Sequence, residues 1–174
     1  MKSTPKDTKT FTYYNANPKN KETGDCVIRA LSLVCNIPYY DVLNELVKSQ
    51  IKSGYMINDS HNWSKFLKDR GFVKLPAPRT SENKRIRGEM FCQQLKKNRF
   101  YEGYKVNDNS TLFVKIGSHH VVGIKNFKIH DIWDSTDDCV GQVWLKIKSI
   151  EEWYIKVWLL INTLFMICVD MMSL

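Results

Sequence analysis

The sequence has no regular pairing among its cysteines. Its 174 residues include five cysteines, an odd number, and no two of them are two to four positions apart. Without that spacing the usual frame of a structural zinc site is excluded, and an odd, irregular set argues against a disulfide framework. We therefore expect reduced thiols, and neither a metal nor another cofactor.

We also expect no secretory leader, because the first residues, MKSTPKDTKTFTYY, are polar. The apolar run VWLLINTLFMICV, residues 157–169, is shorter than the roughly 20 residues that span a bilayer. We expect a cytoplasmic protein with one domain over 1–150 and an apolar C-terminal helix or tail over 151–174. Membrane association through 153–169 is the alternative.

Signatures of nucleic-acid binding are lacking as well, although the net charge is +8. Residues 65–105 contain twelve basic and four acidic residues, whereas the rest of the chain is balanced. This stretch has neither the aromatic pattern of an RNA-recognition motif nor a helix-turn-helix pattern. A solvated basic surface is the simple interpretation, and binding of an acidic partner or nucleic acid is the alternative.

What the sequence does contain is helical periodicity through its first hundred residues, after an irregular segment over 1–22. Apolar spacings of three and four predict helices beginning near Cys26 and Tyr40 and extending over 59–70 and around 88–97. Asn36 is a stop signal for the first of these helices.

Strand periodicity follows. The runs TLFVKI, HHVVGIK and KIHDIW are rich in β-branched and aromatic residues, and turn residues at 117–118 and 126–127 separate them. They predict an antiparallel meander of about three strands, to which QVWLKI (142–147) adds another. Helices first and strands second predict an α+β fold, in which N-terminal helices pack on a small C-terminal antiparallel sheet.

The stretch TGDCVIRALSLVC places Cys26 at the predicted start of the first helix. The thiolate form of cysteine is the nucleophile, and the unpaired N–H groups of a helix N-terminus favour that form. A small buried hydrophobe is the other interpretation, and we assign it to Cys35 near the end of the same helix. Cys26 is therefore a candidate nucleophile.

A thiol nucleophile needs a base within hydrogen-bond reach, and the base needs an acceptor that orients it. His119 and His120 are adjacent at the start of a predicted strand, and Asp131 and Asp134 lie near the end of the next one. A hairpin brings these two strand ends together, which is the arrangement that a Cys-His-Asp triad requires. Exposed histidines beside a turn, with Asp134 as a turn residue, are the alternative.

Neighbouring strand residues point to opposite faces, so only one of the two histidines can face Cys26. We choose His120. A two-residue turn at 126–127 would place Asp131 on the His120 face, so strand parity favours Asp131 as the acid. Asp134 lies just past the strand end.

These motifs, in this order, resemble those of papain-like cysteine peptidases, and most closely those of small domains akin to the bacteriocin-processing peptidases of peptide exporters. The resemblance extends over most of residues 15–145, and it is carried by Gly24-Asp25-Cys26 with Arg29-Ala30, His120-Val121-Val122 and Asp131-Ile132-Trp133-Asp134. Such compact proteins occur in phages and low-GC bacteria. The resemblance implies a papain-like fold and, as the location, the cytoplasm of a bacterial host.

The resemblance also implies roles for four residues. Cys26 is the implied nucleophile, His120 the base and Asp134 the residue that orients it. In papain-like enzymes a polar amide six residues before the nucleophile helps to bind the oxyanion, and here that position holds Asn20 in place of the usual Gln. The family pattern thus favours Asp134 where strand parity favours Asp131, and both stay open.

The leading hypothesis is a thiol-dependent hydrolase, most simply a cysteine peptidase acting on peptide or isopeptide bonds of a peptide or protein substrate. Deamidases and acyltransferases use the same residues, because a triad does not specify a substrate. The alternative is a non-catalytic phage or host interaction module that binds an acidic partner or nucleic acid through residues 65–105. Salt-sensitive binding that survives loss of Cys26 would identify it.

Overall fold

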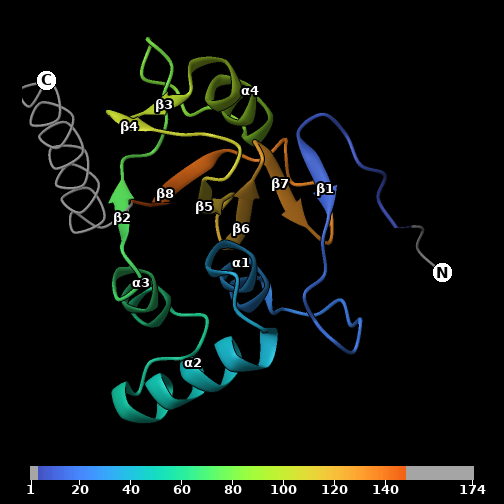
Figure 1. Ribbon diagram of the computed structural model, residues 1–174, viewed down its shortest axis with the longest axis vertical. Helices are drawn as coiled ribbons and strands as arrows, with labels where there is room; N and C mark the ends of the chain where they lie inside the picture. The colour runs from blue at the N-terminus through green and yellow to red at the C-terminus, as the bar shows by residue number, and fades with distance from the viewer. Residues whose placement is uncertain (1–3, 148–174) are drawn as a thin grey trace, which may run out of the picture.

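Helices dominate the first part of the chain, and the later part forms most of the strands of a sheet (Figure 1). The computed structural model describes residues 4–147. Three helices pack against one face of a mostly antiparallel six-stranded sheet, and a fourth helix covers the other face. The predicted α+β class, with N-terminal helices on a C-terminal sheet, is confirmed.

The helices of residues 4–147 are α1 (Cys26–Cys35), α2 (Tyr39–Ser53), α3 (Ser60–Lys68) and α4 (Gly88–Asn98). Local residues define two of their ends. Asn36 adopts the left-handed conformation, with φ 55°, directly after α1. Asp59 caps α3 by accepting a 2.7 Å hydrogen bond from the N–H of His61.

The strands of the main sheet follow the spatial order β1-β7-β6-β5-β8-β2. Their bounds are β1 (Phe11–Tyr13), β2 (Phe72–Leu75), β5 (Thr111–Ile116), β6 (His120–Lys125), β7 (Lys128–Asp131) and β8 (Val140–Lys146). A separate hairpin consists of β3 (Phe100–Tyr101) and β4 (Tyr104–Lys105). Strands β5 to β8 correspond to the four predicted strands, and they pair antiparallel.

The hairpin between β6 and β7 has the predicted two-residue turn. Asn126 and Phe127 both have positive φ angles, 51° and 56°, which match the twist of the flanking strands. Gly123 pairs with His130 and Ile124 with Ile129, so the register is the one that a two-residue turn predicts. The start of β6 therefore lies beside the end of β7.

Strand β1 lies within residues 1–22, which we expected to be irregular, and that expectation was wrong at Phe11–Tyr13. β1 pairs parallel with β7, Phe11 lies opposite Ile129, and Phe11 is fully buried. Three residues carry too little periodicity to predict a strand. The strand depends instead on the free edge that β7 offers, which is a long-range contact.

Two apolar cores, one on each face of the sheet, hold the helices in place. The core under α1 to α3 includes Leu31, Leu46, Trp63, Phe113 and Trp144. The core under α4 includes Phe91, Leu95, Leu112, Ile124 and Ile129. The sheet is thus covered by helices on both faces, and α1 is fixed relative to β6.

The contact between α1 and β6 is close because β6 has a glycine there. A Cβ atom on Gly123 would lie 2.5 Å from Leu33 Cδ2 and 3.2 Å from Val34 Cγ1. Any residue larger than glycine at this position would therefore force these α1 side chains to shift. Gly123 therefore leaves room for Leu33 of α1 to pack directly on the backbone of β6.

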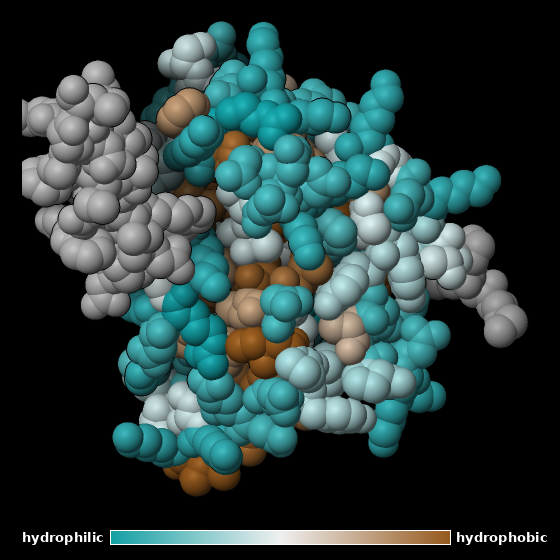
Figure 2. Space-filling model, viewed as in Figure 1, coloured by the Kyte–Doolittle hydropathy of each residue, from teal (hydrophilic) through white to brown (hydrophobic). Residues whose placement is uncertain are grey.

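Most of the face in Figure 2 is hydrophilic, and apolar residues show at its centre, where α1 lies in Figure 1, and at its lower end, over α2. Val47 and Ile51 of α2 are exposed. Within residues 4–147, no helix alone has the length and apolar character to cross a membrane; α1 and α2 meet that test only together, across a bend of 117°. The helix or tail expected over 151–174 lies outside the described residues.

Candidate functional site

Cys26 is the first residue of α1 and is partly exposed. Asp25 occupies the N-cap position, but its side chain makes no capping hydrogen bond. N–H groups in the first turn of a helix have no partner within the helix, and their partial positive charge favours a thiolate at this place. The predicted position of Cys26 at the mouth of a helix is the observed one.

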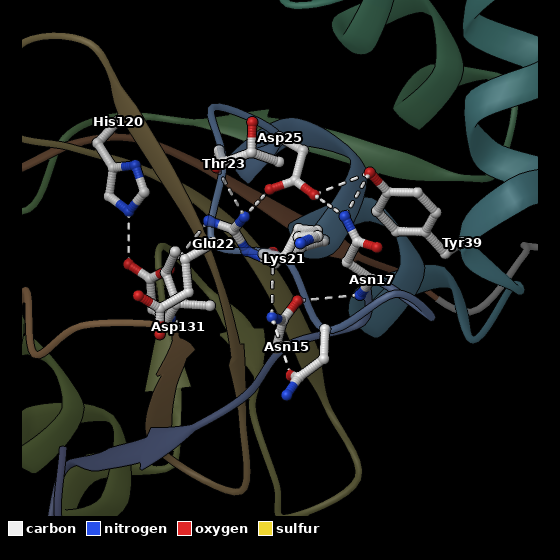
Figure 3. Close-up of polar contacts among 12 residues, drawn as sticks. Asn15, Asn17, Lys21, Glu22, Thr23, Asp25, Tyr39, His120 and Asp131 are labelled. Atoms are coloured by element: carbon white, nitrogen blue, oxygen red, sulfur yellow. Dashed lines mark hydrogen bonds and ion pairs between the residues drawn. The ribbon is translucent and has the colours of Figure 1, made fainter. Parts of the chain in front are cut away.

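His120 begins β6 and Asp131 ends β7, so the hairpin register brings their side chains together. Nε2 of His120 lies 2.5 Å from Oδ2 of Asp131, and Figure 3 shows the ring pointing at that carboxylate. Only 3% of the Asp131 side chain is exposed. A charge-assisted hydrogen bond in such a buried setting is strong and fixes the orientation of the imidazole.

The pKa of His120 is raised from 6.5 to about 9. Burial lowers this pKa, but the hydrogen bond with Asp131, the nearby Cys26 thiol and the negative charges of both groups outweigh the burial. At neutral pH His120 is therefore protonated beside Cys26. A neighbouring imidazolium favours the thiolate form of cysteine.

Trp133 covers one face of His120. The two ring centroids are 4.2 Å apart, the ring planes are inclined by 28°, and the indole is 44% exposed. An indole face stacked on a protonated imidazole attracts it through the ring quadrupole. Trp133 thus separates part of the His120 ring from solvent.

A cavity of about 780 Å³ opens beside Cys26 and His120. Its other walls combine apolar and polar side chains, among them Val27, Trp63, Val121, Trp133, Glu22, Lys115 and His119. The volume falls within the range of ligand-binding clefts. Within residues 4–147, no group of three or more His, Cys, Asp or Glu side chains is arranged to hold a metal ion.

Asp134 lies apart from His120, contrary to the expectation from the family pattern. It is exposed, and its Oδ1 accepts hydrogen bonds from the N–H and the hydroxyl of Thr136, at 3.0 and 2.6 Å. Strand β7 ends at Asp131, and the residue of the following turn that contacts His120 is Trp133. The acid beside His120 is Asp131, which strand parity favours, and Asp134 is a turn residue.

Asn20 is not brought to the cavity, and this corrects the expectation that it donates to an oxyanion there. It is exposed, it has a φ angle of 51°, and its Oδ1 accepts a 3.4 Å hydrogen bond from Asn15. Its N–H donates to the carbonyl of Asn17 in a turn, and Asn20 is not among the residues that line the cavity. The first-turn N–H groups of α1 are then the candidate oxyanion donors, because Cys26 begins that helix.

Two other cysteines are unlike Cys26 in their surroundings. Burial raises the pKa of Cys35 to about 11 and that of Cys92 to about 12. Both thiols stay protonated at neutral pH, which agrees with the apolar packing role expected for Cys35.

The basic residues of 65–105 are spread over α3, β2, the loop before α4, and α4 itself. Ion pairs with carboxylates involve Lys65, Arg70, Lys84, Arg87 and Arg99. These pairs neutralise part of the local charge. Binding of an acidic partner or nucleic acid by this region stays a prediction.

Arg29 is part of the site, although the sequence reasoning gave it no role. It is buried, forms an ion pair with Asp25, and lies 3.5 Å from Asp131. An arginine on an otherwise apolar helix face, four residues after an aspartate, is the pattern that could have indicated this pair. Its second contact, with Asp131, crosses from α1 to β7 and has no local signal.

No family model, no curated protein and no solved structure matches the chain. The case for a function therefore depends on the geometry and chemistry of the site.

Proposed function

We propose that the chain is a thiol-dependent hydrolase whose substrates are peptide or isopeptide bonds. One observation carries the proposal: a helix-terminal thiol and an imidazole line the same cavity, and a buried carboxylate holds that imidazole at 2.5 Å. Cys26, His120 and Asp131 are the three residues. Within the class of thiol hydrolases, we assign the chain to papain-like cysteine peptidases, in fold as well as in mechanism.

In the proposed reaction the Cys26 thiolate attacks the carbonyl carbon of the substrate and a C–S bond forms. His120 then transfers its proton to the leaving amine as the C–N bond breaks. The resulting thioester is hydrolysed by a water molecule, from which neutral His120 takes a proton. Release of the carboxylic acid restores the thiolate and the imidazolium, so the protons balance over one cycle.

The negative charge of the tetrahedral intermediate needs donors close to Cys26. The N–H of Cys26 and its neighbours in the first turn of α1 fit this need, because a helix leaves those groups without internal partners. Asp25 leaves them free, since its carboxylate accepts hydrogen bonds from Tyr39 and Asn17 rather than from the helix start (Figure 3).

Deamidation and acyl transfer would use the same thioester and differ only in the leaving group or in the acceptor. The cavity has charged groups of both signs on its walls, Glu22 and Lys115 among them. Peptide hydrolysis is the simplest outcome, because water needs no separate binding site.

The test is turnover of a mixed set of fluorogenic peptides by the wild-type protein, Cys26→Ser and Cys35→Ser. The last variant is the matched control, because Cys35 lies on the same helix. We expect cleavage by wild type and Cys35→Ser, a thioester adduct on Cys26 by mass spectrometry, and no cleavage by Cys26→Ser. Turnover that persists in Cys26→Ser, or its absence from all three proteins, would contradict the proposal.

A further inference from the structure

Arg29 is a buried cation one turn after Cys26, and only 3% of its side chain is exposed. An arginine in such a place is costly unless its charge is paired and its N–H groups find acceptors. Burial lowers the pKa of Arg29, and the negative charge of Asp131 opposes that effect. Nη1 has acceptors, whereas Nε and Nη2 have no hydrogen-bond partner within residues 4–147, so ion pairing with Asp25 and Asp131 is what compensates the buried charge.

The two ends of the Arg29 guanidinium contact two different parts of the fold. Nη1 forms an ion pair with Asp25 and donates a 3.2 Å hydrogen bond to the carbonyl of Thr23. Nη2 lies 3.5 Å from Oδ1 of Asp131. One side chain thus connects the loop that leads into Cys26 with the end of β7.

The two oxygens of Asp131 have separate partners. Oδ1 accepts a 2.8 Å hydrogen bond from the N–H of Ile132 and faces Arg29. Oδ2 faces His120 at 2.5 Å, and the Ser135 hydroxyl lies 3.5 Å from the same oxygen. This division fixes the rotation of the carboxylate, so that one oxygen always points at the imidazole.

On the other side, Asp25 is held as firmly as Asp131. Its Oδ2 accepts a 2.8 Å hydrogen bond from the Tyr39 hydroxyl and a 3.1 Å hydrogen bond from Asn17 Nδ2. Asp25 is at the N-cap position of α1 and yet does not cap the helix. Its carboxylate instead anchors Arg29.

We propose that Arg29 is a positioning residue, which sets the spacing between Cys26 and the His120–Asp131 pair by bridging Thr23 and Asp25 to Asp131. The inference rests on the proposed function, because the spacing matters only if thiol and imidazole act together. A lysine cannot replace it, since a single ammonium cannot contact both carboxylates as the planar fork does. Arg29 touches no reacting atom and acts through Asp131.

Other charged or titratable groups near this network come from every neighbouring element. Tyr13 of β1 and Tyr39 of α2 act on Arg29. Facing the cavity beside His120 are Glu22, Asp59, Lys115 and His119. A charge-conserving substitution leaves all of these groups unchanged, which makes it the cleanest probe.

The experiment follows the imidazole of His120 by NMR through a pH titration, in wild type, Arg29→Lys and Val34→Ala. His120→Gln assigns the signal. Val34 is a buried residue of α1 outside the network, so Val34→Ala controls for general loosening of the helix. Thermal unfolding of each variant is measured under the same conditions.

We expect the wild-type inflection at about 9, and an inflection at least about one pH unit lower in Arg29→Lys, because the contact with Asp131 loosens at constant charge. The rate of Cys26 alkylation at pH 6 also falls in the same variant, because the imidazolium no longer lies at the same distance from the thiol. Val34→Ala changes neither value. An unchanged inflection in folded Arg29→Lys overturns the inference, and so does an equal shift in Val34→Ala, which would show a merely structural role.

If Arg29→Lys does not fold, the double variant Arg29→Gln with Asp25→Asn takes its place. It replaces an ion pair of zero net charge with an uncharged hydrogen-bonding pair. The same drop in the His120 inflection is expected, and an unchanged inflection again overturns the inference. The titration needs no substrate. Peptide turnover by the wild type, together with an unchanged His120 inflection in the variant, would therefore overturn only the role of Arg29. A lowered His120 inflection in the variant, with no peptide turnover by the wild type, would overturn only the proposed hydrolase activity.

Discussion

At the scale of single residues, the site depends on charges that are kept from solvent. Asp25, Arg29 and Asp131 are all at least nine-tenths buried, and each contacts another of the three. Charges in such a place are stabilising only together, because removal of one leaves another unpaired. Of the three residues, Asp131 is the one that contacts His120 and fixes the orientation of its ring.

Replacing Asp131 should therefore have effects that replacing Asp134 lacks. We expect Asp131→Asn to lower the free energy of unfolding by about 3 kcal/mol, because Arg29 loses a charged partner, and to slow Cys26 alkylation at pH 6 by about tenfold or more. Asp134→Asn should stay within about 0.5 kcal/mol of wild type, since an amide oxygen can still accept from Thr136. Urea unfolding and alkylation rates measure both variants.

The assignment of the acid would have to be reversed if Asp134→Asn slowed alkylation more than Asp131→Asn did. Far-ultraviolet circular dichroism of both variants at the assay pH shows that each is folded. The two substitutions are chemically identical and lie three residues apart, so each is the control for the other.

At the scale of elements, the structures that follow from local sequence patterns were predicted, and those that depend on long-range contacts were not. The apolar spacing after Cys26 and the turn at 126–127 placed α1 and the β6–β7 register, because both patterns lie within one or two neighbouring elements. Strand β1 had no such signal, since its partner strand within residues 4–147 is β7, more than a hundred residues later. The contact between Arg29 and Asp131 was not predicted for the same reason, because the two residues are about a hundred positions apart in the sequence.

In the candidate site, too, the residues placed by local patterns were predicted and those that depend on the surrounding fold were not. Cys26 could be placed from the helix pattern and His120 from its strand, and simple parity identified Asp131. The family pattern misplaced the acid at Asp134 and the amide at Asn20, because both residues lie in turns where their side chains contact Thr136 and Asn15. Turn geometry at a strand end is set by the surrounding fold.

The close contact of α1 with β6 leads to a prediction for Gly123. A Cβ at this position meets Leu33 Cδ2 at 2.5 Å, so Gly123→Ala should lower the free energy of unfolding by about 1–3 kcal/mol. Leu33→Ala in the same chain should recover part of that loss, because it removes the clashing methyl group. A double-mutant cycle by chemical denaturation measures the coupling.

Gly24→Ala is the control for this cycle, because a Cβ on Gly24 would meet nothing within 4 Å. Additive effects of Gly123→Ala and Leu33→Ala, with no coupling between them, would contradict the view that Leu33 needs the space left by Gly123.

At the scale of the whole molecule, the site joins the helical layer to the sheet. Cys26 comes from the first helix, and His120 and Asp131 come from a hairpin about one hundred residues later. Neither layer holds the site alone, so the reactivity of Cys26 should report on the folding of the entire domain. Ionisation at the site is likewise linked to global stability.

That linkage gives the pH dependence of stability a definite sign. The folded-state pKa of His120 is about 9, above the unfolded value of 6.5. The stability contributed by this group is therefore fully present below about pH 6.5 and lost as the pH rises towards 9. We expect the gap in the free energy of unfolding between wild type and His120→Gln to shrink by about 1–3 kcal/mol from pH 6 to pH 9. A gap that is constant or grows with pH would contradict the ion pairing of His120.

The most direct test of the central claim is the pH dependence of Cys26 alkylation by iodoacetamide, followed by peptide mass spectrometry in wild type and His120→Ala. Cys35 and Cys92 are slow internal standards, because burial raises the pKa of their thiols to about 11 and about 12. An activated nucleophile predicts that Cys26 reacts well below pH 7 in wild type and that this reactivity disappears in His120→Ala. A Cys26 that is inert, or that titrates near about 8.5 like a free thiol in both proteins, would contradict the account.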